Sequence, residues 1–446
     1  MHDLRRSRAG APRNSAEPQS VASRFLARVP AVAAAFGIVP LLALVLRRAV
    51  DLPFWDEWEW ADLVYAAHLH TLTFAQVWAP HNEHRILVSN AILLALDAAG
   101  GWNVTREEIV SLVVLALTQL VVWLLIRRTV PRDRRGICFL MSTFVLLGLA
   151  QYENLEWGFQ MAWFICDLGL VVAVWALTIP RRGPGAVFVA IFAATVASLS
   201  SSQGLIVWPA GLIAIGLIPR RSVLTAIAWA VAGVCVSAVA RAGVSAGGPG
   251  HVGFAHPGIL ATYAMIYLGA PLAVSFGPAW AVLAGVSLVA AVTALAARAL
   301  RGSPALRVRL APWLAVAAYP LLCAAVTATG RGGFGVVQAL SSRYTSIAAL
   351  AWVAVIAGFS VAMPWRRPKL ANFALGTALV VVVFASATQT SYGNHMWRDH
   401  AARLRSARAA LAVGDAGSPS LYPDRTRLEL LVGELATVRD GIFSGP

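Results

Sequence analysis

Eleven long apolar segments constrain the fold of this chain more than any other feature of its sequence. Most of them approach the roughly 20 residues that an α-helix needs to cross the hydrocarbon core of a bilayer. Only 13% of the 446 residues are charged, whereas soluble domains carry about 25%. The sequence therefore predicts an all-α polytopic membrane protein with about eleven transmembrane helices, within a range of eleven to thirteen. The apolar segments run over residues 30–48, 107–126, 136–150, 160–179, 186–201, 204–218, 222–243, 278–300, 310–329, 344–363 and 370–389.

Arginine-rich turns separate many of these segments and predict how the chain is oriented. They lie at residues 127–135, 181–182, 220–221, 298–309 and 366–369, and the positive-inside rule places them in the cytoplasm. Eleven crossings from a cytoplasmic N-terminus satisfy every cluster. On that assignment the cytoplasmic segments carry 22 basic and three acidic residues, and the rest of the chain carries 14 and 18. The net charge of +15 thus reflects topology and contact with anionic lipid headgroups, and we do not expect nucleic acid as a partner.

Two further apolar stretches, Ile86–Gly100 and Ile259–Phe276, do not fit this orientation as crossings. Each would invert the arginine pattern if it spanned the membrane. We interpret both as interfacial or re-entrant helices on the outer face, where irregular backbone is tolerated when protein buries it. Thirteen crossings, with some arginine turns outside, are the alternative.

This topology divides the chain into three parts. Residues 1–29 form a basic cytoplasmic tail, and residues 30–389 form the transmembrane domain with a long first extracytoplasmic loop at 51–106. Residues 390–446 form an extracytoplasmic helical tail. All four cysteines lie in apolar segments, so we expect neither a disulfide framework nor a CxxC metal site. The expected location is the plasma (inner) membrane, with the N-terminus in the cytoplasm and the C-terminus outside.

The first outer loop opens on a run of acids that is the strongest candidate for chemistry. Pro53 can start a helix there, on which Asp56, Glu59, Trp60 and Leu63 would share one side. A carboxylate held above the membrane beside a lipid phosphate suits a general base toward an acceptor hydroxyl. The alternative is an interfacial amphipathic helix whose acids are only solvated. The acids of the run are Asp51, Asp56, Glu57, Glu59 and Asp62.

A second group of candidates ends the same loop, in the sequence from His81 to Arg85. Two histidines three residues apart with Glu83 between them are able to bind a divalent metal, although the spacing is not that of a zinc protease. We favour hydrogen bonds from His81, Glu83 and His84 to a sugar or acceptor, with Arg85 on a phosphate. A polar helix cap before the next helix is the alternative. No metal or other cofactor is therefore expected.

Residues 151–160 form a third polar patch, at the edge of an apolar segment. Carboxylates, amides and aromatic rings together suit a sugar, which presents hydroxyls beside an apolar face. We therefore expect Glu153, Asn154, Trp157 and Gln160 to shape a sugar pocket. An ordinary aromatic belt with helix caps is the alternative.

Arginines on the predicted outer side form the fourth group. Arg331 and the pair Arg343-Tyr344 lie there against the positive-inside trend. The planar guanidinium matches phosphate oxygens, so we expect Arg331, Arg343 and Tyr344 to bind the phosphate of a donor. A structural salt bridge to the acidic loop is the alternative. Residues 200–203, His251 and His256 are weaker candidates.

One helix, then a long outer loop that opens on the acidic pair Asp56-Glu57, then many helices, resembles the GT-C superfamily. These integral membrane glycosyltransferases use polyprenyl-phosphate sugars, and they include protein O-mannosyltransferases, aminoarabinose transferases and mycobacterial arabinosyltransferases. In that family an Asp or Glu early in the first outer loop is the catalytic base, so only Asp56 and Glu57 carry over. The resemblance implies transfer of a sugar from a polyprenyl-phosphate donor to an extracytoplasmic hydroxyl. Asp56 would be the base, with Glu57 or Glu59 in support.

The acceptor implied by this resemblance is a glycan, a lipid or a protein of the cell envelope. Two other functions remain as alternatives. A transporter or flippase of lipid-linked sugars normally needs acids within its spans and often shows inverted repeats, whereas the middle parts of the predicted spans contain no acid here except Asp167, near the outer end of its helix. An O-antigen-type polymerase or ligase would carry its largest outer loop late in the chain.

Overall fold

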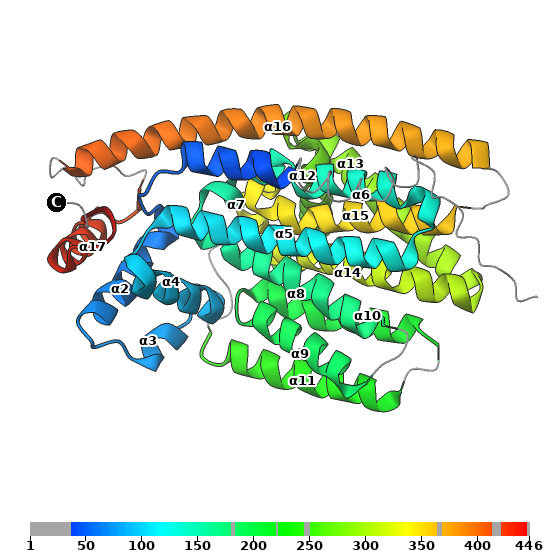
Figure 1. Ribbon diagram of the computed structural model, residues 1–446, viewed down its shortest axis with the longest axis horizontal. Helices are drawn as coiled ribbons and strands as arrows, with labels where there is room; N and C mark the ends of the chain where they lie inside the picture. Colours follow the sequence, from blue (N-terminus) through cyan, green and yellow to red (C-terminus); the bar gives the residue numbers. More distant parts are fainter. Residues whose placement is uncertain are drawn as a thin grey trace, which may run out of the picture.

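The computed structural model describes residues 37–179, 183–219, 222–244, 250–363, 368–412 and 421–443. The predicted tail at 1–29 and the arginines at 181–182, 220–221 and 366–367 lie outside the described residues. Long helices lie side by side in a bundle, and short helices gather at one of its ends (Figure 1). The bundle contains residues 37–48, α5 (Val104–Thr129), α6 (Arg135–Leu146), α7 (Tyr152–Glu156), α8 (Met161–Leu177), α9 (Pro184–Ser198), α10 (Val207–Leu217), α11 (Val223–Arg241), α12 (Pro257–Ala273), α13 (Pro278–Arg301), α14 (Pro304–Arg331), α15 (Thr345–Ala362) and α16 (Pro368–Ala412).

The predicted all-α polytopic membrane architecture is confirmed. In the described part of the chain, nine helices are long and apolar enough to cross a membrane, and three shorter apolar helices accompany them. The helices at the centre, α8 and α15, bury most of their side chains, whereas α11 leaves large apolar side chains exposed, including Leu224 and Val234. Water would not favour such a surface. The outer helices therefore present a surface suited to lipid.

The two ends of the bundle differ in chemistry. One end carries the arginine-rich turns at 127–135 and 298–309, and we call it the cluster end. There Arg309 donates to the carbonyl oxygen of Thr129 (2.8 Å) and Arg134 donates to that of Ser360 (3.1 Å). At the other end, the loop end, lie the short helices α2 (Trp60–His68), α3 (Phe74–Trp78) and α4 (Leu87–Gly100) (Figure 1). This agrees with the expected interfacial position of residues 86–100. Which end faces the cytoplasm stays a prediction from the arginine pattern.

Helices α12 and α13 form a tight antiparallel pair in which glycines allow close approach of the two backbones. Gly269 packs on the backbone of Ala281, and Gly285 packs on that of Met265. The pair connects α11, which ends at the loop end, with α14, which begins at the cluster end. Two antiparallel helices that both spanned the membrane would return the chain to the loop end. Because the chain instead reaches the cluster end, the pair makes only one net crossing. Although α12 is long and apolar enough to span, this supports the interpretation of 259–276 as re-entrant.

The end of the chain departs from the sequence prediction. Helix α16 does not stop near residue 389 but continues without a break over 45 residues, about 67 Å at 1.5 Å per residue. Gly393 lies against the carbonyl of Leu149, where a larger residue would clash. The short second helix expected near residues 425–437 is present as α17 (Arg425–Val438). It packs against α2, and Arg427 forms an ion pair with Asp62.

Candidate functional site

The acidic run folds as a 3₁₀ turn, Trp55–Glu59, that leads directly into α2. The predicted single α-helix with four residues on one side is therefore wrong. In a 3₁₀ turn the side chains at i and i+3 eclipse, which brings Asp56 and Glu59 to the same side. Trp60 and Leu63 belong to α2 and are both buried. Asp56 therefore lines a different cavity from Trp60 and Leu63, whereas Glu59 lines the same cavity as both of them.

His81 lies between these two carboxylates. Its Nδ1 is 3.0 Å from Glu59 Oε2, and its Nε2 is 3.6 Å from Asp56 Oδ2. Burial alone would lower the pKa of His81, but the two carboxylates outweigh burial and raise the pKa to about 9. The imidazole is therefore charged at neutral pH. Asp56 and Glu59, which lie on opposite sides of it, are both partly exposed.

A tight turn from His81 to His84 sets this geometry. The two residues exchange backbone hydrogen bonds of 2.8 and 3.1 Å, and Asn82 takes a left-handed φ of 48°, which asparagine tolerates. Glu83 leaves the turn in the other direction and pairs with Arg331 at 2.7 Å. Burial and the neighbouring charge of His81 lower the pKa of His84 to about 4, so this second ring stays neutral.

Arg85 anchors the turn and lines neither of the two cavities described below. Its guanidinium donates to the carbonyl oxygens of Trp78 and Ala242 and lies over the Trp78 ring, 4.4 Å from its centroid. The side chain is buried. Its donors are thus directed to backbone carbonyls, which does not favour the predicted contact with a donor phosphate.

The charged His81 makes stability depend on pH. The pKa of His81 is about 9 in the folded protein and 6.5 in the unfolded chain. Between these two pH values the folded protein keeps a proton on His81 that the unfolded chain loses. The stabilisation is complete below pH 6.5 and is lost as the pH rises through 9, at up to about 1.4 kcal/mol per pH unit. We expect His81→Gln to remove this part of the slope, measured by denaturant unfolding of purified protein between pH 6.5 and 9. His84→Gln is the control, and equal slopes for wild type and His81→Gln would contradict the assignment.

A first cavity of about 350 Å³ opens beside Asp56 at the loop end of the bundle. Three arginines line it, from the end of α11, the end of α14 and the turn before α15. Arg331 pairs with Glu83, and Arg241 donates to the backbone oxygen of Glu83 (3.2 Å). Within the described residues no carboxylate lies at ion-pair distance from Arg343, and its buried Nε has no hydrogen-bond partner. Arg241 also has no carboxylate at ion-pair distance among the described residues, so the cavity holds two arginines whose charge is available to an anion, and Arg343 additionally keeps an unused donor.

The structure divides the predicted sugar-binding residues. Gln160 lines the first cavity with a buried Oε1 that has no hydrogen-bond partner, and Tyr344 lines it too. Glu153 and Asn154 do not line it: Glu153 accepts the backbone N–H of Arg343 (3.0 Å), and the Asn154 amide donates to the Arg343 carbonyl (3.0 Å). These two residues instead fix the backbone of Arg343.

Two further predicted residues are structural. Trp157 packs edge-on against Phe54, with centroids 5.3 Å apart. Glu57 is buried and lines neither cavity; its two oxygens accept the backbone N–H groups of Phe54 and Phe159, each at 2.9 Å. Burial raises the pKa of Glu57 to about 8, although the backbone hydrogen bonds oppose the shift. Glu57 therefore fastens the loop to the 158–160 segment, which does not favour it as the base.

Several residues of the first cavity were missed or ranked low in the sequence. Arg241 was not predicted. It lies at the outer end of a predicted span, against the positive-inside trend, and the same criterion that indicated Arg331 would also have indicated Arg241. Trp163 follows the 151–160 patch by one helical turn. The weaker candidates Ser201, Ser202, Gln203 and His251 all line the cavity.

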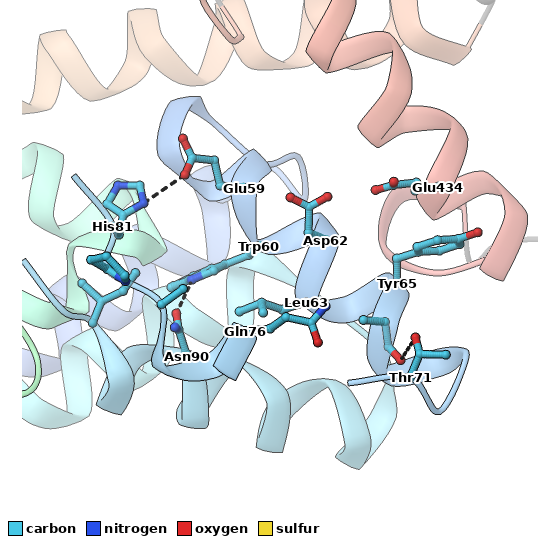
Figure 2. Close-up of a pocket in the computed structure, with 14 residues that line it drawn as sticks. Glu59, Trp60, Asp62, Leu63, Tyr65, Thr71, Gln76, His81, Asn90 and Glu434 are labelled. Carbon is cyan, nitrogen blue, oxygen red and sulfur yellow. Dashed lines mark hydrogen bonds and ion pairs between the residues drawn. The ribbon is translucent and has the colours of Figure 1, made fainter. Parts of the chain in front are cut away.

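A second cavity of about 530 Å³ lies on the other side of His81 (Figure 2). Figure 2 shows Glu59, Asp62 and Glu434 along its rim, with the Trp60 indole donating to Asn90 (2.9 Å) at its floor. His81 lines both cavities, whereas Asp56 lines the first and Glu59 the second. Of the residues that the structure describes, three carboxylates and no arginine or lysine line the second cavity. Its charge is therefore opposite to that of the first.

No family model and no curated protein matches the sequence. Among solved structures, the chain is similar to ArnT from Cupriavidus metallidurans bound to undecaprenyl phosphate. The match has 15% sequence identity and a TM-score of 0.35, and it covers 76% of this chain and 78% of the ArnT chain. A similarity of this size carries no argument about activity or ligands. The functional conclusion for this integral membrane protein has to rest on the geometry of its own cavities.

Proposed function

We propose that this protein is a glycosyltransferase of the GT-C type, which moves a sugar from a polyprenyl-phosphate donor to a hydroxyl group of an acceptor. One observation carries the proposal. A partly exposed carboxylate, Asp56, lines the same cavity as three arginines, of which Arg343 has no carboxylate partner among the described residues. A carboxylate that accepts a proton and a cationic site for a phosphate are the two parts that such a transfer needs.

The phosphate of the donor would bind at the arginines. Arg343 offers a guanidinium that is partly desolvated and lies beside the ring of Tyr344 (5.6 Å), and guanidinium–phosphate hydrogen bonds are among the stronger ones in proteins. Arg331 would contribute its remaining donors while Glu83 holds it in place. The apolar tail of the donor would lie in the membrane along the exposed helices. Gln160 and Trp163 would contact the sugar.

In the reaction, the acceptor oxygen would attack the anomeric carbon of the donor sugar. The bond from that carbon to the phosphate oxygen breaks as the new carbon–oxygen bond forms, and Asp56 takes the proton of the acceptor hydroxyl. The leaving phosphate carries its own negative charge, so the arginines stabilise it and no protonating acid is needed. His81 would orient Asp56, and Glu59 would orient His81 from the other side.

The acceptor would approach through the second cavity, because His81 forms the wall that the two cavities share. The carboxylates there repel an anionic acceptor and accept hydrogen bonds from hydroxyl groups. We therefore expect a hydroxyl-rich acceptor without phosphate near its reacting end. The proposed setting remains the cell envelope, at the outer face of the plasma membrane.

The test uses full-length protein purified in detergent and a panel of polyprenyl-phosphate sugars with different sugar groups. We expect one donor to bind and to release polyprenyl phosphate in the presence of a neutral glycan acceptor. The same preparation in liposomes is tested for movement of the lipid-linked sugar across the bilayer. Transport without release of polyprenyl phosphate would instead establish a flippase, and absence of binding to every donor would remove the proposal.

A further inference from the structure

A second cluster of ionisable side chains lies away from both cavities. His68 ends α2, Asp97 lies on α4, and Asp440 follows α17. The Nε2 atom of His68 is 3.2 Å from Asp97 Oδ1 and 3.0 Å from Asp440 Oδ2. Both carboxylates are buried, with side chains 5% and 4% exposed, whereas the His68 side chain is 34% exposed. Residues that are far apart in the sequence thus meet at one point, and His68 is the member that solvent reaches.

We propose that His68, Asp97 and Asp440 form a divalent-metal site of the zinc type. One ligand atom from each of the three residues lies within 4.8 Å of the other two. In tetrahedral zinc sites, bonds of about 2.0–2.1 Å place the ligand atoms about 3.3 Å apart, close to the 3.0 and 3.2 Å found here. Three protein ligands leave a fourth position for water, on the exposed side beside His68. Calcium prefers six to eight oxygen ligands, which this set does not supply.

The charges of the cluster favour a dication over an ion triad without metal. In the described residues the ion pairs of Asp97 and Asp440 are both with His68. A single imidazolium balances one of the two buried carboxylates, and without a metal the other has to be balanced by a proton shared between Asp97 and Asp440, whose carboxyl groups lie within hydrogen-bond distance. A bound dication balances both and takes the neutral imidazole as a ligand.

The surroundings also resemble those of a metal site. Metal-binding carboxylates are usually oriented by hydrogen bonds from outside the site. The backbone N–H of Trp102 donates to both oxygens of Asp440, at 3.1 and 3.3 Å. This contact fixes the orientation of the Asp440 carboxylate toward His68.

The consequence of the site is structural. Asp440 lies just after α17, which packs on α2 and contributes Glu434 to the second cavity. A metal at this position ties the C-terminal segment to the first loop and so fixes one wall of that cavity. This inference does not depend on the proposed transfer reaction, because the ligands lie outside both cavities.

The experiment uses the full-length protein in detergent, stripped with a chelator and titrated with Zn²⁺ alone. We expect one tightly bound zinc per chain by elemental analysis and a higher unfolding temperature with zinc than without. Asp440→Asn and His68→Gln should each weaken zinc binding by at least about 100-fold, since even residues outside the ligand set cost 10- to 100-fold. Asp424→Asn, in the same segment, and His84→Gln, in the other histidine group, are the matched controls and should bind zinc as wild type does.

X-ray absorption on the zinc-loaded wild type gives a measurement that does not depend on how the variants fold. We expect a shell of nitrogen and oxygen ligands with one histidine. Failure of the wild type to bind zinc stoichiometrically would overturn the proposal. Zinc affinities of His68→Gln and Asp440→Asn equal to that of the wild type would overturn it as well. So would a loss of zinc in His84→Gln alone, which would place the metal at the turn from His81 to His84.

Discussion

Asp56→Asn is expected to lower sugar transfer by about 10²–10⁴-fold, the usual contribution of a general base. The substitution keeps the size of the side chain and removes its ability to take a proton from the acceptor. Binding of the donor should be unchanged or tighter, because a negative charge has been removed from a cavity that receives a phosphate. The measurements are turnover with saturating donor and, separately, the donor Kd.

Asp399→Asn is the matched control, since Asp399 lies on α16, outside both cavities, and pairs with His395. Its turnover should equal that of wild type. A folded Asp56→Asn with turnover within a few-fold of wild type would exclude Asp56 as the base. If Glu59→Gln then showed the loss instead, the base would lie on the second-cavity side of His81.

Arg343→Gln is expected to weaken donor binding by about 10- to 100-fold, which corresponds to the loss of a hydrogen bond to a charged group. The substitution removes the cavity arginine that has neither a carboxylate partner in the described part of the chain nor a hydrogen-bond partner for its buried Nε. Because a leaving phosphate carries more charge in the transition state than in the bound donor, kcat should fall as well as KM rise. Both are obtained from steady-state release of polyprenyl phosphate.

Two comparisons test whether the guanidinium itself acts. Arg343→Lys should recover part of the affinity, because a lysine keeps the charge but not the planar fork. Arg405→Gln, an exposed arginine on α16, should leave both constants at the wild-type values. Unchanged kcat and KM in Arg343→Gln would show that the phosphate binds elsewhere, with Arg241 and Arg331 as the remaining cavity arginines.

Some of the candidate site was predictable because it depends on where residues lie along the chain. Apolar segments must be buried in lipid or protein, so the acids of residues 51–62 had to lie at an end of the bundle. Arginines that break the positive-inside trend pointed to Arg331 and Arg343. Both were found at the first cavity with Asp56.

Other residues of the same short motifs differ in their tertiary contacts, which the neighbouring residues in the sequence do not predict. Asp56 and Glu57 are adjacent, yet one lines a cavity and the other is buried against the backbone of Phe159. A 3₁₀ turn, rather than the expected α-helix, decides which acid points outward. Arg85 and Arg343 looked alike as phosphate ligands, but the two terminal nitrogens of Arg85 donate to the carbonyls of Trp78 and Ala242.

The sequence by itself determined that this is a helical membrane protein with an acidic first loop, because the cost of placing charge in hydrocarbon acts on each segment separately. The tertiary structure decided which side chains meet. It placed His81 between Asp56 and Glu59 at the wall between two cavities of opposite charge, and it joined His68, Asp97 and Asp440 from three distant segments. These meetings depend on how helices pack and where turns end, and no local pattern in the chain encodes them.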